Sequence, residues 1–326
     1  MQHIWYELDQ DAVIEAVESL GYFSDLRLFP LNSYENRVWQ VGIEDEVPLI
    51  AKFYRPNRWT NDQIIAEHQF TRHLANAEMS VVPPIAIGGQ TLFTHKDFRF
   101  SIFKRQGGHA PELDNFDHLE KLGRALGEIH QLGQQVDLSL RDSMCDARMA
   151  NIARDFIIEG DWVGEAYRSQ WADLSGDMIE QIEAAFKQVN PKLIALHGDC
   201  HPGNILWRDD RPHFVDFDDC IRGPAMADLW MFLSGDRADK TAQLDAIIEN
   251  YELFTHFDQN ELALIEPLRA MRLLHYTGWL ARRWEDPAFP MHFPWFNSER
   301  YWGEQILALR EQLAALDEAP ISLVPY

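Results

Sequence analysis

The chain has 326 residues, of which 46% are hydrophobic and 12% aromatic, so a sizeable core is available and wholesale disorder is not expected. Its 29 basic and 52 acidic side chains give a formal net charge of −23, which would repel nucleic-acid phosphates and an anionic bilayer. No apolar run approaches the roughly 18 residues of a membrane-spanning helix, so we expect neither nucleic acid nor a membrane as a partner.

The first 106 residues are predicted to form a small strand-rich lobe. We expect helices at residues 9–20 and from Thr60 onward, and strands at residues 37–41, 48–54, 91–95 and 98–104. Thr60 and Gln63 have the spacing of a capping box, which predicts where the second helix begins. The segment Gln106-Gly-Gly-His is the first strong flexible break, and we place the lobe boundary there.

Residues 107–326 are predicted to form a larger, mostly helical lobe. Apolar residues recur at helical spacing in residues 119–132, 177–189, 225–233, 241–254 and 261–284. Residues 205–216 are the exception, because they have the pattern of a strand hairpin that turns at Asp209-Asp-Arg-Pro. The fold class is therefore α+β and bilobal, with a cleft between the lobes where ligands commonly bind.

Two polar clusters flank this hairpin, His197-Gly-Asp-Cys-His-Pro-Gly-Asn and Asp216-Phe-Asp-Asp. An Asp, an Asn five positions later and a second Asp after a hairpin have the layout of a phosphoryl-transfer site. Asp199 would accept or orient the proton of the attacking hydroxyl. Asn204 and Asp216 would offer oxygen ligands to magnesium, which prefers few protein oxygens together with phosphate and water.

Neighbouring polar residues have alternative interpretations. His197 is either an acid or base, or a side chain that packs under the loop and hydrogen-bonds to backbone. Asp218 is expected behind the metal ligands, and Asp219 is expected to hold the loop. Asp228 either accepts backbone hydrogen bonds from the Asp199 loop or is an acid favoured at a helix start.

The first lobe offers candidates for nucleotide binding. Lys52 interrupts an apolar strand, and Glu67 on the following helix is a reasonable partner that would fix the ammonium for gripping phosphates. The alternative is a lysine that extends to water and a glutamate on a solvated helix face. Ser33 lies in a polar segment, Asn32-Ser-Tyr-Glu-Asn-Arg, which is either a phosphate-covering loop or an ordinary hairpin turn.

The two polar clusters resemble the catalytic and metal loops of the aminoglycoside phosphotransferase-like and choline-kinase-like branch of the protein kinase superfamily. Within that branch, further segments resemble the bacterial stress response kinases, and the similarity runs over nearly the whole chain. These segments are Leu31-Asn-Ser-Tyr-Glu-Asn-Arg-Val, Lys52-Phe-Tyr-Arg-Pro, Glu67-His-Gln-Phe, Leu196-His-Gly-Asp-Cys-His, Gly203-Asn-Ile-Leu-Trp-Arg-Asp, Asp228-Leu-Trp-Met and Ile265-Glu-Pro-Leu-Arg-Ala-Met-Arg-Leu.

The resemblance implies a bilobal kinase fold, ATP as phosphoryl donor, Mg²⁺, and transfer to Ser or Thr of protein substrates. It also implies a cytoplasmic monomer that protects cells under stress. By position, Asp199 matches the proton acceptor, and Asn204 and Asp216 match the magnesium ligands. Ser33 matches a serine that contacts ATP. The cytoplasmic expectation agrees with an acidic N-terminal segment that lacks a signal pattern, and with three cysteines without metal-binding spacing.

The chain differs from ordinary protein kinases in ways that leave two classes of phosphoryl acceptor possible, a protein or a small molecule. It lacks a Gly-x-Gly-x-x-Gly loop, has Gly198 where an arginine is common, and has no Ala-Pro-Glu segment between Asp216 and Asp228. Loops that help to hold a substrate peptide are therefore not predicted. A small-molecule kinase for an amino alcohol or amino sugar is the alternative function, and a nucleotide-binding module without chemistry is a third.

Overall fold

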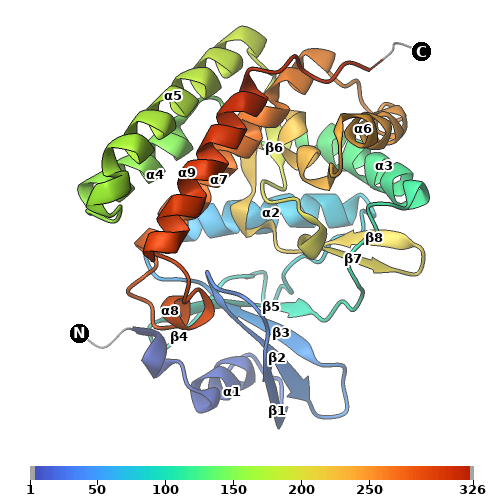
Figure 1. Cartoon of the computed structure of the whole chain (residues 1–326). Coiled ribbons are helices and arrows are strands. Elements are labelled where there is room, and N and C mark those ends of the chain that lie inside the picture. Colours follow the sequence, from blue (N-terminus) through green and yellow to red (C-terminus); the bar gives the residue numbers. More distant parts are fainter. Residues whose placement is uncertain (1–3, 324–326) are drawn as a thin grey trace.

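The computed structural model describes residues 4–323, in which a sheet packs below a larger helical part (Figure 1). The sheet has five strands in the order β1-β2-β3-β5-β4, and every neighbouring pair is antiparallel. Its strands are β1 (Ser24–Pro30), β2 (Arg37–Ile43), β3 (Leu49–Phe53), β4 (Phe93–His95) and β5 (Phe98–Lys104). The helices of this region are a 3₁₀ turn (Ile4–Glu7), α1 (Gln10–Glu18) and α2 (Asn61–Asn76). The predicted strand-rich first lobe is confirmed.

The remainder of the chain is mainly helical, as predicted. Its helices are α3 (Phe116–Gly133), α4 (Arg148–Glu159), α5 (Glu165–Val189), α6 (Arg237–Tyr251), α7 (Ile265–Arg282), α8 (Ala288–His292) and α9 (Glu299–Leu316). Two small antiparallel pairs lie among them, β6 (Ile194–Leu196) with β9 (Ile221–Gly223), and β7 (Ile205–Arg208) with β8 (Arg211–Phe214). Short 3₁₀ turns lie at Pro202–Asn204, Phe217–Asp219, Ala225–Asp228, Trp230–Phe232 and Gln259–Leu264. Within the described residues, none of the helices has the length and apolar character required to cross a membrane.

The start of α2 follows directly from the local sequence. The Thr60 hydroxyl accepts a hydrogen bond from the Gln63 amide at 3.2 Å, and the Gln63 side chain accepts one from the Thr60 amide at 2.9 Å. This reciprocal capping box satisfies two backbone donors that the first helical turn leaves free. The predicted cap is therefore confirmed, and it fixes the position of Glu67 two turns later.

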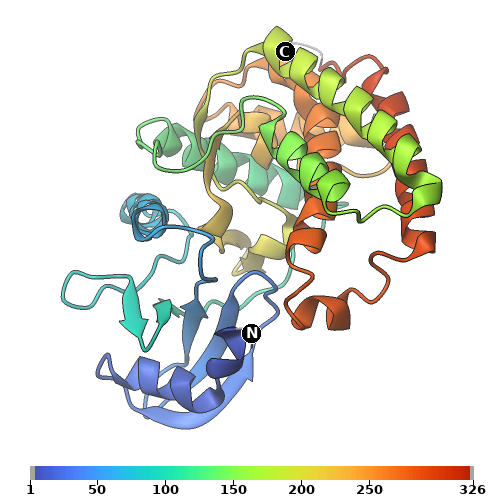
Figure 2. The same cartoon turned by 90° about the vertical axis from the view of Figure 1, so that its left-hand side faces the viewer.

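The described residues form two hydrophobic cores, a smaller one at the sheet and a larger one in the helical part. The smaller core joins one face of α1 to the sheet, through side chains such as Val13, Val17 and Phe100. The larger core fills the helical part and also includes Phe70 and Leu74 of α2. In both views α2 lies between the sheet and the helical part (Figures 1 and 2). A helix that precedes the expected boundary at Gln106 thus packs mainly with the second lobe.

Some of the predicted elements differ from the structure. Residues 225–233 were expected to be a helix but form two 3₁₀ turns, because nearly all of their side chains are buried and no solvent-facing helical side remains. Helix α5 begins at Glu165, twelve positions before the predicted Asp177, since its first turns carry polar residues that obscure the periodicity. Strand β1 and helices α4 and α9 were not predicted from the sequence.

Candidate active site

The proposed catalytic loop, residues 197–204, is held in place by a carboxylate that lies below its backbone. The buried Asp228 accepts hydrogen bonds from the amides of His197, at 2.7 Å, and Gly198, at 2.9 Å. His130 contacts the same carboxylate at 3.2 Å. Burial alone would raise the pKa of Asp228, but its hydrogen bond with His130 and the nearby charges lower that pKa, so the carboxylate stays ionised. The predicted support of this loop by Asp228 is confirmed.

His197 packs beneath the loop instead of facing a substrate. Its side chain is 1% exposed, its Nε2 lies 2.8 Å from the Val215 carbonyl oxygen, and its ring lies 4.4 Å from that of Phe217. These contacts connect the catalytic loop to the strand that leads to Asp216. The structural interpretation of His197 is therefore confirmed.

Glycine is required at position 198. The residue has a φ of +85°, a conformation that L side chains rarely adopt, and a Cβ there would collide with the carbonyl oxygen of Asp219. The catalytic loop thus approaches the Asp216 loop more closely than any side chain would permit. This close approach explains why the chain departs from kinases that have an arginine at this position.

The hairpin brings Asn204 and Asp216 to the same side of the catalytic loop. The Asn204 side-chain amide donates to the Asp199 carbonyl oxygen at 2.9 Å, while the Val215 amide donates to the Asn204 carbonyl oxygen at 3.0 Å. Asp216 has left-handed backbone angles, with φ 60° and ψ 62°. Non-glycine residues in this region are uncommon, and they occur where the surroundings impose the conformation, often at functional sites.

Lys52 pairs with the second loop and not with Glu67. Its ammonium lies 2.7 Å from Asp216 Oδ1 and 3.2 Å from Asp218 Oδ1. Within the described residues, Glu67 is not among the ion-pair partners of Lys52, so the predicted Lys52–Glu67 pair is absent from this structure. Two carboxylates of the helical lobe, and not Glu67, contact the ammonium. The local sequence around Lys52 could not indicate these distant partners.

Glu67 nevertheless lies within the same buried region. Its side chain is 3% exposed, and burial raises its pKa to about 7, although the charge of Lys52 opposes that change. A carboxyl with this pKa is only about half ionised at neutral pH. Glu67 therefore differs from Asp216 and Asp218, the two carboxylates that pair with Lys52.

Asp218 connects the two lobes. Its carboxylate accepts a hydrogen bond from Asn36 at 3.1 Å and pairs with Arg58, which also pairs with Asp219. Burial would raise the pKa of Asp218, but the charges of Lys52 and Arg58 hold it well below its usual value. Sequence reasoning placed Asp218 behind the metal ligands but missed Asn36 and Arg58, which lie more than a hundred positions away in the chain.

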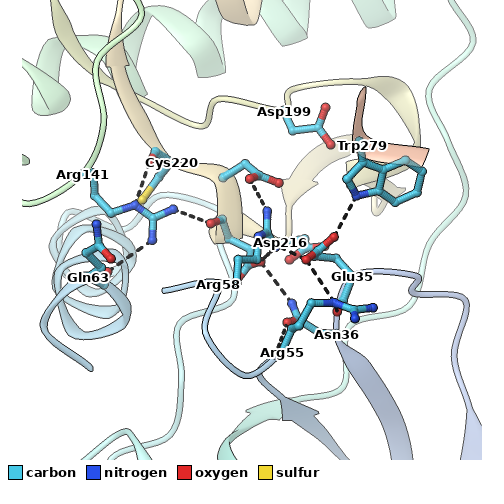
Figure 3. A network of polar contacts seen from close by, with 12 residues as sticks. Glu35, Asn36, Arg55, Arg58, Gln63, Arg141, Asp199, Asp216, Cys220 and Trp279 are labelled. Carbon is cyan, nitrogen blue, oxygen red and sulfur yellow. Dashed lines mark hydrogen bonds and ion pairs between the residues drawn. The ribbon is translucent and has the colours of Figure 1, made fainter. Parts of the chain in front are cut away.

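A second set of contacts joins the β1–β2 loop to the end of α7. The Glu35 carboxylate accepts hydrogen bonds from Trp279 at 2.8 Å and from Arg283 at 2.7 Å. Asp286 accepts from Arg55 at 2.8 Å. Figure 3 shows the contact between Glu35 and Trp279, with Asn36, Arg55 and Arg58 of the N-terminal segment also drawn. None of these partners was predicted from the sequence, because no local pattern relates them.

Asp199 faces α7. Its Oδ1 accepts a hydrogen bond from Arg272 at 2.6 Å, and its Oδ2 lies 3.5 Å from His201 Nε2. The side chain is 27% exposed, so the carboxylate remains accessible.

Ser33 lies half-buried in the β1–β2 loop, and no hydrogen bond of its hydroxyl is present among the described residues. Its predicted contact with ATP remains a prediction.

The residues of the two loops fit a magnesium ion of the kind that binds through nucleotide phosphates. Asn204 uses its amide nitrogen internally, which leaves its side-chain oxygen free, and Asp216 uses Oδ1 for Lys52, which leaves Oδ2 free. Within residues 4–323 no group of three or more His, Cys, Asp or Glu side chains is arranged around a metal position. A site of one carboxylate, one amide oxygen and phosphates does not require such a group.

Comparison with known proteins decides the family. The sequence profile described as the Phosphotransferase enzyme family matches residues 27–265. The chain belongs to this phosphotransferase family. Among its relatives, stress response kinase A of Escherichia coli (strain K12) is 44% identical over 318 residues, covering 98% of this chain and 96% of that protein. The serine/threonine protein kinase RdoA of Salmonella typhimurium is 42% identical with the same coverage.

Solved structures share the phosphotransferase fold. An amicoumacin kinase in complex with AMP-PNP and Ca²⁺ has a TM-score of 0.75 and 18% identity, covering 98% of this chain and 96% of that one. A microcompartment-associated aminopropanol kinase has a TM-score of 0.69 and 16% identity, covering 95% of this chain and 97% of that one. The predicted kinase-like fold and the class of phosphotransferase enzyme are both confirmed.

Proposed function

We propose that this phosphotransferase is an ATP- and magnesium-dependent serine/threonine protein kinase that acts in the stress response. The observation that carries the proposal is a pair of contacts: Asn204 binds the backbone of Asp199, and Lys52 of the first lobe binds Asp216 of the second. The names of the relatives at 44% and 42% identity support a stress role and a Ser/Thr acceptor. A cytoplasmic, monomeric protein without nucleic-acid or membrane partners is part of the same proposal.

The two lobes have different roles in this proposal. Residues 1–106 would hold the nucleotide, with Lys52 and Ser33 toward the phosphates and Glu67 in the buried region behind them. Residues 107–326 would supply the catalytic and metal-binding loops. Asn204 and Asp216 would hold magnesium through their free oxygens, and this ion, when bound, would offset the negative charge of the phosphates.

In the proposed transfer, Asp199 orients the acceptor hydroxyl. The hydroxyl oxygen forms a bond to the γ-phosphorus, and the bond from that phosphorus to the bridging oxygen breaks. ADP leaves with the electron pair, and the hydroxyl proton passes to the Asp199 carboxylate. Asp228 keeps the loop amides fixed so that Asp199 stays aligned during this step, because its hydrogen bonds hold both preceding residues.

Labelled ATP distinguishes this function from its alternative. Wild-type enzyme and Asp199→Asn are incubated with a protein extract from cells that lack the kinase, and separately with a panel of amino alcohols and amino sugars. We expect Ser/Thr labelling of proteins by the wild type, and a loss of about a hundred- to ten-thousand-fold in the variant with nucleotide binding retained. Efficient turnover of one small alcohol without protein labelling would refute the protein-kinase proposal.

A further inference from the structure

Arg272 differs from the other arginines around the site because its ion-pair partner is Asp199, the proposed catalytic carboxylate. Its Nη1 lies 2.6 Å from Asp199 Oδ1, and 45% of its side chain is exposed. Among residues 4–323 this is the only ion pair of Arg272. By contrast, Arg58 is held by Asp218 and Asp219, and Arg283 by Glu35, so these cations are neutralised by carboxylates that are not proposed to react.

The partner of Arg272 is the carboxylate that must turn to the acceptor hydroxyl. Among the described residues the guanidinium of Arg272 uses only Nη1, for Asp199. Its other N–H groups can therefore bind a second anion beside the acceptor hydroxyl before the transfer. Carboxylate and phosphate oxygens fit the planar donor face of arginine and form strong, charge-assisted hydrogen bonds with it.

The surrounding side of α7 adds further positive charge. Burial, together with the nearby charges of Arg282, Arg272 and Arg58, lowers the pKa of His275 to about 4. Arg282 has a buried Nη1 with no hydrogen-bond partner among the described residues. Three arginine side chains thus lie near His275, although the chain as a whole carries a formal charge of −23.

We propose that Arg272 selects the substrate, by binding an anionic group that lies next to the accepting Ser or Thr. The group is a carboxylate of Asp or Glu, or the phosphate of an already phosphorylated residue. This inference rests on the proposed protein-kinase function and names the class of its substrate. A cationic amino alcohol or amino sugar would instead meet Arg272 as a like charge beside the reacting hydroxyl.

The negative charge of the whole chain does not prevent this recognition. Charges farther apart than the Debye length of about 8 Å at physiological ionic strength are largely screened. A direct pair with Arg272 lies well within that distance and is therefore screened much less than contacts between distant charges. The substrate is therefore recognised by local acidity next to the hydroxyl, and the overall charge of the substrate has a smaller effect.

The test compares matched serine peptides that differ at one position beside the serine. That position carries Glu, Gln, Lys or phosphoserine, and kcat and KM are measured separately for the wild type, Arg272→Gln and Arg272→Glu. For the wild type we expect at least a tenfold higher kcat/KM for the Glu peptide than for the Lys peptide, mainly through KM. Arg272→Glu is expected to reverse that order, and Arg272→Gln to remove it.

Arg310→Glu is the matched control, because it makes the same change of charge on the exposed side of α9. It should keep the wild-type order of peptides. A preference for phosphoserine over Glu assigns the site to phosphate, and the opposite preference assigns it to carboxylates. Circular dichroism and nucleotide binding confirm that each variant is folded.

The outcomes separate the two proposals. If the wild type phosphorylates no peptide and no protein, the protein-kinase function fails and this inference fails with it. If the wild type phosphorylates the Glu, Gln and Lys peptides equally well, only the role of Arg272 is overturned. An equal fall of kcat for all peptides in Arg272→Gln, without any change of order, would mean that Arg272 acts on the transferred phosphoryl group and not on specificity.

Discussion

The ammonium of Lys52 lies 2.7 Å from Asp216 Oδ1, although 164 positions separate the two residues in the chain. The same ammonium lies 3.2 Å from Asp218, whose side chain is only 5% exposed. One buried cation of the sheet therefore holds two carboxylates of the loop that is proposed to bind magnesium. This contact is one of several that join the lobes at the site, together with those of Asn36 and Arg58 with Asp218.

Replacement of Lys52 by methionine should weaken both folding and nucleotide binding. Removing one partner of a buried ion pair leaves a carboxylate without compensation, and since Arg58 still pairs with Asp218, we expect a loss of up to about 3 kcal/mol in the free energy of unfolding. Denaturant unfolding and titration with a non-hydrolysable ATP analogue measure the two effects. Lys104→Met, at an exposed position of β5, is the control. Wild-type stability and affinity in Lys52→Met would contradict the assigned role.

Asp228 should affect catalysis without touching the substrate. In Asp228→Asn the side chain loses its charge and keeps only one acceptor oxygen for the amides of His197 and Gly198. Hydrogen bonds to a charged group contribute roughly 1.5–3 kcal/mol each, so we expect a loss of about 2 kcal/mol in stability and at least a tenfold fall in kcat. KM for ATP should change little.

Steady-state kinetics and thermal unfolding measure this prediction. Asp236→Asn is the matched control, because Asp236 caps the exposed start of α6 and asparagine caps helices equally well. If Asp228→Asn raises KM for ATP but keeps kcat, the residue acts on nucleotide binding and not on the alignment of the catalytic loop.

Local patterns in the sequence predicted the parts of the fold that depend on near neighbours. The capping box of Thr60 and Gln63 and the hairpin that follows Asn204 involve residues only a few positions apart, so the sequence contains the necessary information. The three residues of the proposed phosphoryl-transfer motif could be proposed from the sequence for the same reason, since all lie within one short segment.

Contacts between distant segments could not be predicted in this way. Lys52 had several acidic candidates, and the choice of Asp216 and Asp218 over Glu67 depends on how the lobes pack. The contacts of Glu35 with Trp279 and Arg283 join residues more than two hundred positions apart, and nothing near Glu35 in the sequence indicates them. The mistaken helix at residues 225–233 has a similar origin, because apolar periodicity does not distinguish a helix from buried 3₁₀ turns.

Gly198→Ala should disable the site even though it adds a single methyl group. The positive φ costs of the order of 1–3 kcal/mol for a non-glycine residue, and the new Cβ would also collide with the Asp219 carbonyl oxygen. We expect lower thermal stability and a fall in kcat of more than a hundredfold, because the loop that carries Asp199 must shift.

The matched control for this change is Gly164→Ala. Gly164 has no atom within 4 Å of an added Cβ, and its φ is −55°. Alanine there should be neutral or slightly stabilising, and activity should be unchanged. Equal effects of the two substitutions would show that the close approach at Gly198 has no special importance.

Glu261 should make the stability of the protein fall as the pH rises. Its side chain is 3% exposed, and burial raises its pKa from 4.5 to about 7 while the Met226 amide donates to it at 2.9 Å. Between these two values the unfolded chain has released the proton that the folded chain still holds. The unfolded state therefore binds fewer protons, and the free energy of unfolding decreases with pH by up to roughly 3 kcal/mol across this interval.

Glu261→Gln removes the titrating proton but keeps an oxygen that can accept from the Met226 amide. We expect the free energy of unfolding of this variant to depend less on pH between 5 and 7 than that of the wild type, with the difference largest near the upper end. Urea unfolding at a series of pH values measures both curves. Glu249→Gln, on the exposed side of α6, should leave the wild-type dependence intact. Parallel curves for the wild type and Glu261→Gln would mean that Glu261 has the same pKa in the folded and unfolded chain.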